Sequence, residues 1–143
     1  MKKLLEGKTP ANEIKENLIE EIKKLKSDGI NPTLCVIEVG DDPASKIYLR
    51  VKRNLAKKVG IKEIGLHFPA NTSQAELLEK IEDLNQDPSI NGIMVQLPVP
   101  PQIDPRDIFE TIAPEKDADG FSPLNLGRLW VGQSDVIPAT VRS

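Results

Sequence analysis

The chain has 143 residues, which is enough for one domain with a buried core, and a formal net charge of -3. An acidic excess argues against general binding to nucleic acid or to an anionic membrane surface, because both attract basic proteins. No apolar run is as long as a membrane-spanning helix, and the charged N-terminus differs from a signal peptide.

Cysteine and histidine are too scarce for a disulfide framework or a zinc site. Cys35 is the only cysteine and lies in an apolar run, so we expect it to pack in the core of a protein from a reducing, cytoplasmic compartment. His67 is the only histidine, and together with Cys35 it makes no metal-ligand cluster. We therefore expect no bound metal.

Helices and short apolar segments alternate along the first hundred residues. The amphipathic segments with capping signals predict helices at 9–28, 43–60 and 73–86. The short apolar runs predict strands at 34–39, 62–68 and 90–97. Nearly continuous apolar strands are typical of a parallel sheet that is covered on both faces. The predicted fold class is therefore α/β, with three layers: a mostly parallel sheet and flanking helices.

The stretch between the first strand and the second helix carries much of the candidate chemistry. Gly40 permits a tight turn, Asp42 is a good helix cap, and Pro43 suits the first helical position. Tyr48 and Lys52 are four residues apart, so they lie on one face of the predicted helix. The ring can stack on a flat heterocycle while the amine moves a proton. An ordinary solvent-exposed helix face also carries such pairs.

A second row on the same predicted helix is apolar. Ile47, Val51 and Leu55 follow each other at intervals of four residues. We expect this row to face the core, which would leave Tyr48 and Lys52 at its border, near the mouth of a cleft.

The chain changes character after the third predicted strand. The Pro-Val-Pro-Pro segment 98–101 cannot form a helix or a sheet ladder, so it predicts a rigid loop. A short helix is expected at 105–112, and a polar loop at 114–121 contains Asp117 and Asp119. The residues that follow predict a short helix opening at Ser122 or Pro123 and ending at Gly127, and an irregular tail in which Val136 and Ile137 are candidates for a short strand.

In an open α/β sheet, ligands bind outside the carboxyl ends of the strands. Three polar segments lie near such ends, at 40–52, 96–101 and 114–120. If these segments converge, then a lysine, a tyrosine, a glutamine and an aspartate line one cleft: Lys52, Tyr48, Gln96 and Asp119. Considered alone, each residue has a simpler explanation. Gln96 could be a polar residue at a strand end that reaches solvent, and Asp119 could be an ordinary turn residue that bonds its own backbone before a glycine.

Taken together and in this order, the segments resemble the folate-dependent methylene-tetrahydrofolate dehydrogenase/methenyl-tetrahydrofolate cyclohydrolase (FolD) family. The resemblance rests on three signatures and covers almost the whole chain: residues 39–61, 91–100 and 114–129. In that family, methylene-tetrahydrofolate is oxidised by hydride transfer to NADP, and the methenyl cation is then hydrolysed to formyl-tetrahydrofolate. The resemblance implies that tetrahydrofolate is the carrier of the one-carbon group and that no metal takes part.

The resemblance also implies roles for individual residues. Lys52 would be the central acid/base, with Gln96 directing it or the attacking water. Tyr48 would stack on the folate ring system, and Asp119 would pair with the amino-pyrimidine edge of the pterin. The residues implied in substrate binding are Ser45, Tyr48, Lys52, Gln96, Leu97, Pro98 and Asp119, of which Tyr48, Lys52 and Gln96 are the implied catalytic residues.

The match is to the N-terminal half of the family only. Residues 1–143 are expected to form the catalytic, substrate-binding domain, and an NADP-binding Rossmann domain is expected after residue 143, because the chain has no G-x-G-x-x-G fingerprint. The family further implies a cytoplasmic homodimer that works in one-carbon metabolism, which supplies purine and amino-acid biosynthesis.

Two positions depart from the family pattern, and two other functions stay open. Ala139 stands where the family usually has a cysteine, and Ser122 stands where a histidine is common. The chain could instead be the substrate domain of an enzyme similar to shikimate or amino-acid dehydrogenases. It could also be a folate-binding module without catalytic activity.

Overall fold

A computed structural model describes residues 7–134 and 136–142. Its elements in chain order are α1 (Lys8–Ser27), β1 (Thr33–Val39), α2 (Pro43–Val59), β2 (Lys62–Phe68), α3 (Gln74–Gln86), β3 (Gly92–Val95), α4 (Pro105–Thr111), α5 (Pro123–Trp130) and α6 (Ala139–Arg142). The three strands form one parallel sheet in the order β2-β1-β3. The predicted α/β fold class is confirmed.

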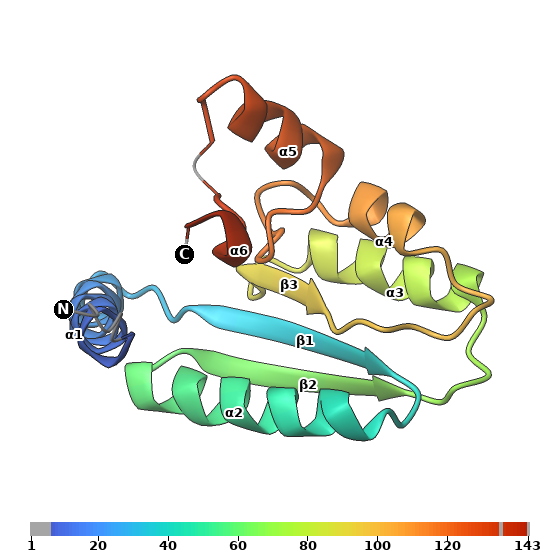
Figure 1. The fold of residues 1–143 in the computed structure, drawn as a ribbon, viewed down its shortest axis with the longest axis horizontal. Coiled ribbons are helices and arrows are strands. Elements are labelled where there is room, and N and C mark those ends of the chain that lie inside the picture. Colours follow the sequence, from blue (N-terminus) through green and yellow to red (C-terminus); the bar gives the residue numbers. More distant parts are fainter. Residues whose placement is uncertain (1–6, 135, 143) are drawn as a thin grey trace, which may run out of the picture.

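The sheet is the middle of three layers, with α2 on one side and α3 and α4 on the other (Figure 1). The central strand β1 serves both sides, because its side chains alternate between the two faces. Cys35, Ile37 and Val39 point into the larger core under α3 and α4, whereas Val36 packs with Leu49 of α2. Burial on both faces explains why β1 reads as a continuous apolar run.

Helix α2 begins and ends where its local sequence predicts. The carboxylate of Asp42 accepts a hydrogen bond from the Ser45 N–H at 2.7 Å, which caps the first turn. Gly60 closes the last turn with φ 94°, a left-handed conformation that glycine adopts without steric cost. These two ends fix where the side chains of α2 stand over the sheet.

The prediction that Ile47, Val51 and Leu55 face the core is wrong. Their side chains are 58%, 59% and 39% exposed. The buried face of α2 is rotated away from them and consists of Ser45, Leu49, Ala56 and Val59. An i, i+4 apolar row therefore misidentified the core face, because this spacing identifies a face of the helix but not which face packs on the sheet.

Smaller differences concern element ends. Strand β3 is shorter than the predicted strand 90–97, although the Gln96 N–H still donates to the Ile37 carbonyl at 2.8 Å and so extends the ladder. Helix α5 continues past Gly127 to Trp130 and is capped by the Ser122 hydroxyl, which accepts a hydrogen bond from the Asn125 N–H. Residues 136 and 137 form no strand.

Cys35 is a core residue, as the sequence predicts. Its side chain is fully buried in the cluster under α3 and α4, and burial raises the pKa of its thiol to about 11. A thiol in such surroundings stays protonated and is a poor nucleophile. None of the helices in the described part of the chain is long and apolar enough to span a membrane.

We expect Leu77→Ala to destabilise the chain by roughly 2–5 kcal/mol, because it leaves a cavity in the core beneath α3. Leu77 is fully buried, whereas Leu124 on α5 is 50% exposed and provides a matched control. Leu124→Ala should change the free energy of unfolding by no more than about 0.5 kcal/mol. Urea denaturation measures both, and equal losses in the two variants would contradict this assignment of the core.

Candidate functional site

The side chain of Lys52 reaches from α2 to strand β3. Its Nζ lies 3.4 Å from Oε1 of Gln96 and 3.2 Å from Sδ of Met94. Met94 and Gln96 are two residues apart, so their side chains leave the same face of the sheet, which is the face that α2 covers. Within the described residues, no carboxylate lies within ion-pair distance of the Lys52 ammonium. The amine is therefore held by two neutral acceptors.

Asp119 joins this pair in a cavity of about 170 Å³. The cavity is lined by Lys52, Val95, Gln96, Leu97, Phe109, Asp119 and Phe121. The segments around Lys52, Gln96 and Asp119, which are far apart in the sequence, thus meet at one place. Cavities for whole small-molecule ligands usually measure about 300–1,000 Å³. This cavity can therefore enclose only one end of a larger ligand.

The loop that carries Asp119 is held against the free edge of β3. The Ile93 N–H donates to the Lys116 carbonyl at 2.7 Å, and the Ala118 N–H donates to the Ile93 carbonyl at 3.2 Å. Asp117 thereby forms a parallel bridge with Ile93. This edge pairing places Asp119 close to the end of the strand from which Gln96 projects.

The surroundings of Asp119 oppose its negative charge. Burial raises the pKa of this carboxyl, the positive charge of Lys52 lowers it, and the negative charge of Asp117 raises it again; the net direction is upward. A buried carboxyl of this kind gains from a ligand that donates hydrogen bonds to it.

Ser45, Leu97 and Pro98 form the adjoining wall. The Ser45 hydroxyl donates to the Leu97 carbonyl at 3.5 Å, which ties the start of α2 to the loop after β3. Leu97 and Pro98 also line a second cavity of about 600 Å³ with the proline-rich loop. Leu97 is the residue that belongs to both cavities.

Tyr48 is the candidate that stands apart from the enclosed part of the site. Its side chain is 65% exposed and does not line the cavity that holds Lys52. It lies one turn before Lys52 on α2, so its ring stands outside the cavity.

Sequence reasoning missed four side chains at the site, of which Val95 is the last residue of β3 and lines the cavity. Met94 contacts the Lys52 amine, and Phe109 and Phe121 line the cavity with their rings 5.4 Å apart in an edge-to-face arrangement. The alternation of side chains along a strand could have predicted Met94, because the residue two positions before Gln96 lies on the same face of the sheet. Phe121 belongs to the polar loop segment 114–121, but no sequence pattern points to Phe109.

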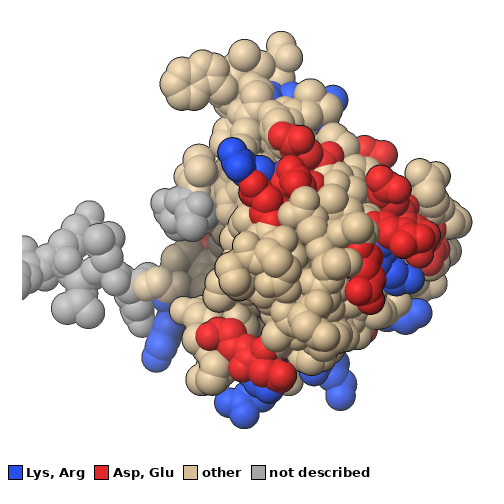
Figure 2. All heavy atoms as spheres, turned by 90° about the vertical axis from the view of Figure 1, so that its right-hand side faces the viewer, with Lys and Arg blue, Asp and Glu red and all other residues tan. Residues whose placement is uncertain are grey.

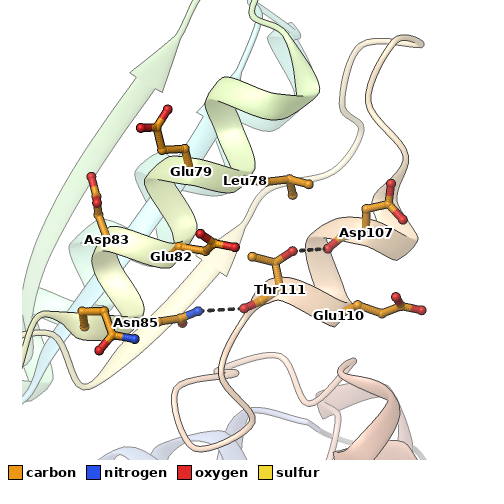
Figure 3. Close-up of a pocket in the computed structure, with 9 residues that line it drawn as sticks. Leu78, Glu79, Glu82, Asp83, Asn85, Asp107, Glu110 and Thr111 are labelled. Carbon is orange, nitrogen blue, oxygen red and sulfur yellow. Dashed lines mark hydrogen bonds between the residues drawn. The ribbon is translucent and has the colours of Figure 1, made fainter.

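A larger groove, of about 860 Å³, lies between α3 and α4 (Figure 3). Five of its lining side chains are acidic: Glu79, Glu82, Asp83, Asp107 and Glu110. Acidic side chains also gather in several clusters on the face of the molecule shown in Figure 2. No group of three or more His, Cys, Asp or Glu among the described residues is arranged to hold a metal ion. The residues that line this groove include no lysine or arginine, although Asp83 is paired with Lys80 at 3.6 Å, so the groove lacks the mixed chemistry of the smaller cavity.

Comparison with known proteins gives one family throughout. The family described as "Tetrahydrofolate dehydrogenase/cyclohydrolase, catalytic domain" matches residues 5–119. The "Bifunctional protein FolD 2" of Lactobacillus johnsonii is 99% identical over 143 residues, which are 100% of this chain and 51% of that protein. The chain thus spans about half the length of the curated relatives it matches.

Solved structures show the same fold. A 5,10-methylenetetrahydrofolate dehydrogenase from the silkworm, Bombyx mori, aligns with a TM-score of 0.95 at 45% identity, covering 99% of this chain and 49% of that one. The methylenetetrahydrofolate dehydrogenase-cyclohydrolase of Trypanosoma brucei, complexed with NADP cofactor and inhibitor, aligns with a TM-score of 0.89 at 33% identity. That alignment covers 98% of this chain and 48% of that chain.

We expect Asp119→Asn to raise the melting temperature of the ligand-free chain at neutral pH. The pKa of Asp119 is raised on folding, mainly by burial, so its stabilising contribution is present when the carboxyl is protonated and is lost as the pH rises through the raised value. The variant has no such loss, and the two melting temperatures should converge below about pH 3. A lower melting temperature of the variant at neutral pH would contradict this account.

Proposed function

Because the chain belongs to the tetrahydrofolate dehydrogenase/cyclohydrolase family, we propose that it binds the reduced folate and supplies the acid/base lysine of both reactions. The observation that carries this proposal is the meeting of Lys52, Gln96 and Asp119 in one cavity. The cavity accommodates the pterin end of a folate, and the remainder of the ligand extends past Leu97 and Pro98 toward the proline-rich loop.

The cyclohydrolase step follows from the position of Lys52. Water attacks the electrophilic methenyl carbon, and the neutral amine of Lys52 accepts the proton that the water releases. The same amine then returns the proton to the ring nitrogen whose bond to that carbon breaks. The hydroxyl group left by the water loses its remaining proton to solvent as the C=O bond forms, so a formyl group stays on the other nitrogen. Gln96 accepts a hydrogen bond from Lys52 through Oε1 and thereby directs the amine toward the cavity.

Asp119 recognises the pterin. A carboxylate that lines the cavity can accept two parallel hydrogen bonds from an amino-pyrimidine edge. Tyr48, exposed at the rim, is free to stack on the part of the folate that leaves the cavity, and such stacking requires an accessible ring. Pro98 and its neighbours give this wall little conformational entropy to lose when the ligand binds.

NADP is the proposed cofactor of the dehydrogenase step, but the start of the helix that follows β1 does not fit its phosphates. The Asp42 carboxylate already caps this helix by accepting the Ser45 N–H, so the helix start offers a negative charge to a pyrophosphate. We infer that a second, nucleotide-binding half, as expected after residue 143, brings the cofactor to the open side of the folate site. When bound, NADP accepts the hydride from methylene-tetrahydrofolate.

The remaining assignments follow from the proposed reaction. We propose that the working protein is a homodimer in the cytoplasm, with tetrahydrofolate as its one-carbon carrier. Its formyl product would serve purine biosynthesis, and its exchange of one-carbon groups would link it to amino-acid biosynthesis.

We expect Lys52→Met to reduce methenyl-tetrahydrofolate hydrolysis by at least about 10²-fold, because methionine is also an unbranched side chain, one atom shorter, but cannot accept a proton. Hydrolysis is followed by the loss of methenyl absorbance, with Lys58→Met on the same helix as the control. Circular dichroism should show both variants folded. Hydrolysis by Lys52→Met at the wild-type rate would remove the proton-transfer role from this residue.

We expect Asp119→Ala to weaken the binding of tetrahydrofolate by roughly tenfold to a hundredfold, because a charge-assisted pair of hydrogen bonds is lost. Calorimetric titration of the chain gives the dissociation constant, and a parallel titration with shikimate tests the competing substrate class. Unchanged affinity for the folate would remove the pterin assignment. Binding of shikimate alone would replace the proposed function.

A further inference from the structure

We propose that Asp117 is a positioning residue for folate recognition, acting through Asp119; this inference rests on the proposed function. Asp117 is only 4% exposed and does not line the cavity, so it cannot touch the ligand itself. Its carboxylate turns inward, toward the backbone of the loop that carries Asp119.

Three hydrogen bonds converge on this carboxylate. Oδ1 accepts the Gly120 N–H at 2.9 Å, and Oδ2 accepts the Ser122 N–H at 2.7 Å. Oδ2 also accepts Nδ2 of Asn125 at 3.0 Å, and that amide nitrogen donates in addition to the Pro114 carbonyl at 2.8 Å. One buried carboxylate thereby ties the residues after Asp119 to the start of α5 and to the beginning of the loop.

These bonds hold Asp119 from its C-terminal side. On its N-terminal side, the Ala118 N–H is already bonded to Ile93 of β3. Gly120 adopts φ 73°, and a Cβ there would lie 3.2 Å from the Val136 side chain, so a larger residue would strain this turn. The backbone of Asp119 is therefore fixed between two anchors, which sets the direction of its side chain.

The negative charge of Asp117 suits its three hydrogen-bond donors. Burial alone would raise the pKa of Asp117, but the hydrogen bonds from Ser122 and Asn125 outweigh that effect and the net direction is downward. The group is a carboxylate at neutral pH, and its negative charge in turn contributes to the raised pKa of Asp119. Asparagine cannot replace it, because either orientation of the amide turns an N–H toward one of the donors.

A double-mutant cycle on folate binding tests this inference in the 143-residue chain. Asp117→Asn should weaken tetrahydrofolate binding by about tenfold when Asp119 is present. In the Asp119→Ala background, the same substitution should have no further effect, since the group through which it acts is gone. Asp87→Asn is the matched control, because Asp87 also accepts a backbone N–H, from Ser89, but lies outside the cavity; it should leave the affinity unchanged.

The outcomes separate this inference from the proposed function. Equal losses of affinity in both backgrounds would show a merely structural role for Asp117, and no loss in either would also overturn the inference. If Asp119→Ala binds the folate as tightly as the wild type does, the pterin assignment fails as well. If Asp117→Asn does not fold, Asn125→Ala replaces it in the same cycle, because it removes only one of the three donors. Hydrogen exchange at the Gly120 and Ser122 amides should accelerate in Asp117→Asn.

Discussion

The candidate site depends on the attachment of the loop after α4 to the free edge of β3. Without the backbone bonds at Ile93, the segment that carries Asp119 would be an ordinary surface loop, with its side chains far from Lys52. A short edge strand has few unpaired backbone N–H and C=O groups, and in β3 those of Ile93 form hydrogen bonds with this loop. The buried carboxylate of Asp117 completes the attachment and makes an irregular segment as rigid as its neighbours.

Rigidity of this kind matters because the site is divided among three segments. The amine comes from a helix, the amide from the end of a strand, and the carboxylate from a loop. Their relative positions depend on how α2 lies over the sheet. The Asp42 cap sets where this helix begins, and its buried residues Ser45, Leu49, Ala56 and Val59 define the face that is covered. Electrostatics then adjust the chemistry, since Lys52 rests on the neutral acceptors Met94 and Gln96.

The exposed apolar row of α2 shows how a periodic pattern can mislead. Ile47, Val51 and Leu55 satisfy the spacing of a buried face, yet the buried face contains Ser45 and Ala56. Hydrophobicity alone ranks isoleucine above serine, but close packing of a helix on a sheet favours small side chains at the points of nearest approach. The same rotation moves Tyr48 outward and leaves Lys52 facing the cavity.

The sequence by itself determined the alternation of helices and strands, the two ends of α2, and the identity of the polar residues at the strand ends. These features are local, because each depends on residues within a few positions of one another. The tertiary structure alone decided which face of α2 is buried, that Met94 and Phe109 belong to the site, and that Asp117 supports Asp119 from behind. The first two features depend on contacts between segments tens of residues apart, and spacing along one segment carries no information about which side chain of another segment will meet it. The bonds of Asp117 are made within its own loop and to the start of α5, but the loop is irregular, so no periodic pattern predicts them.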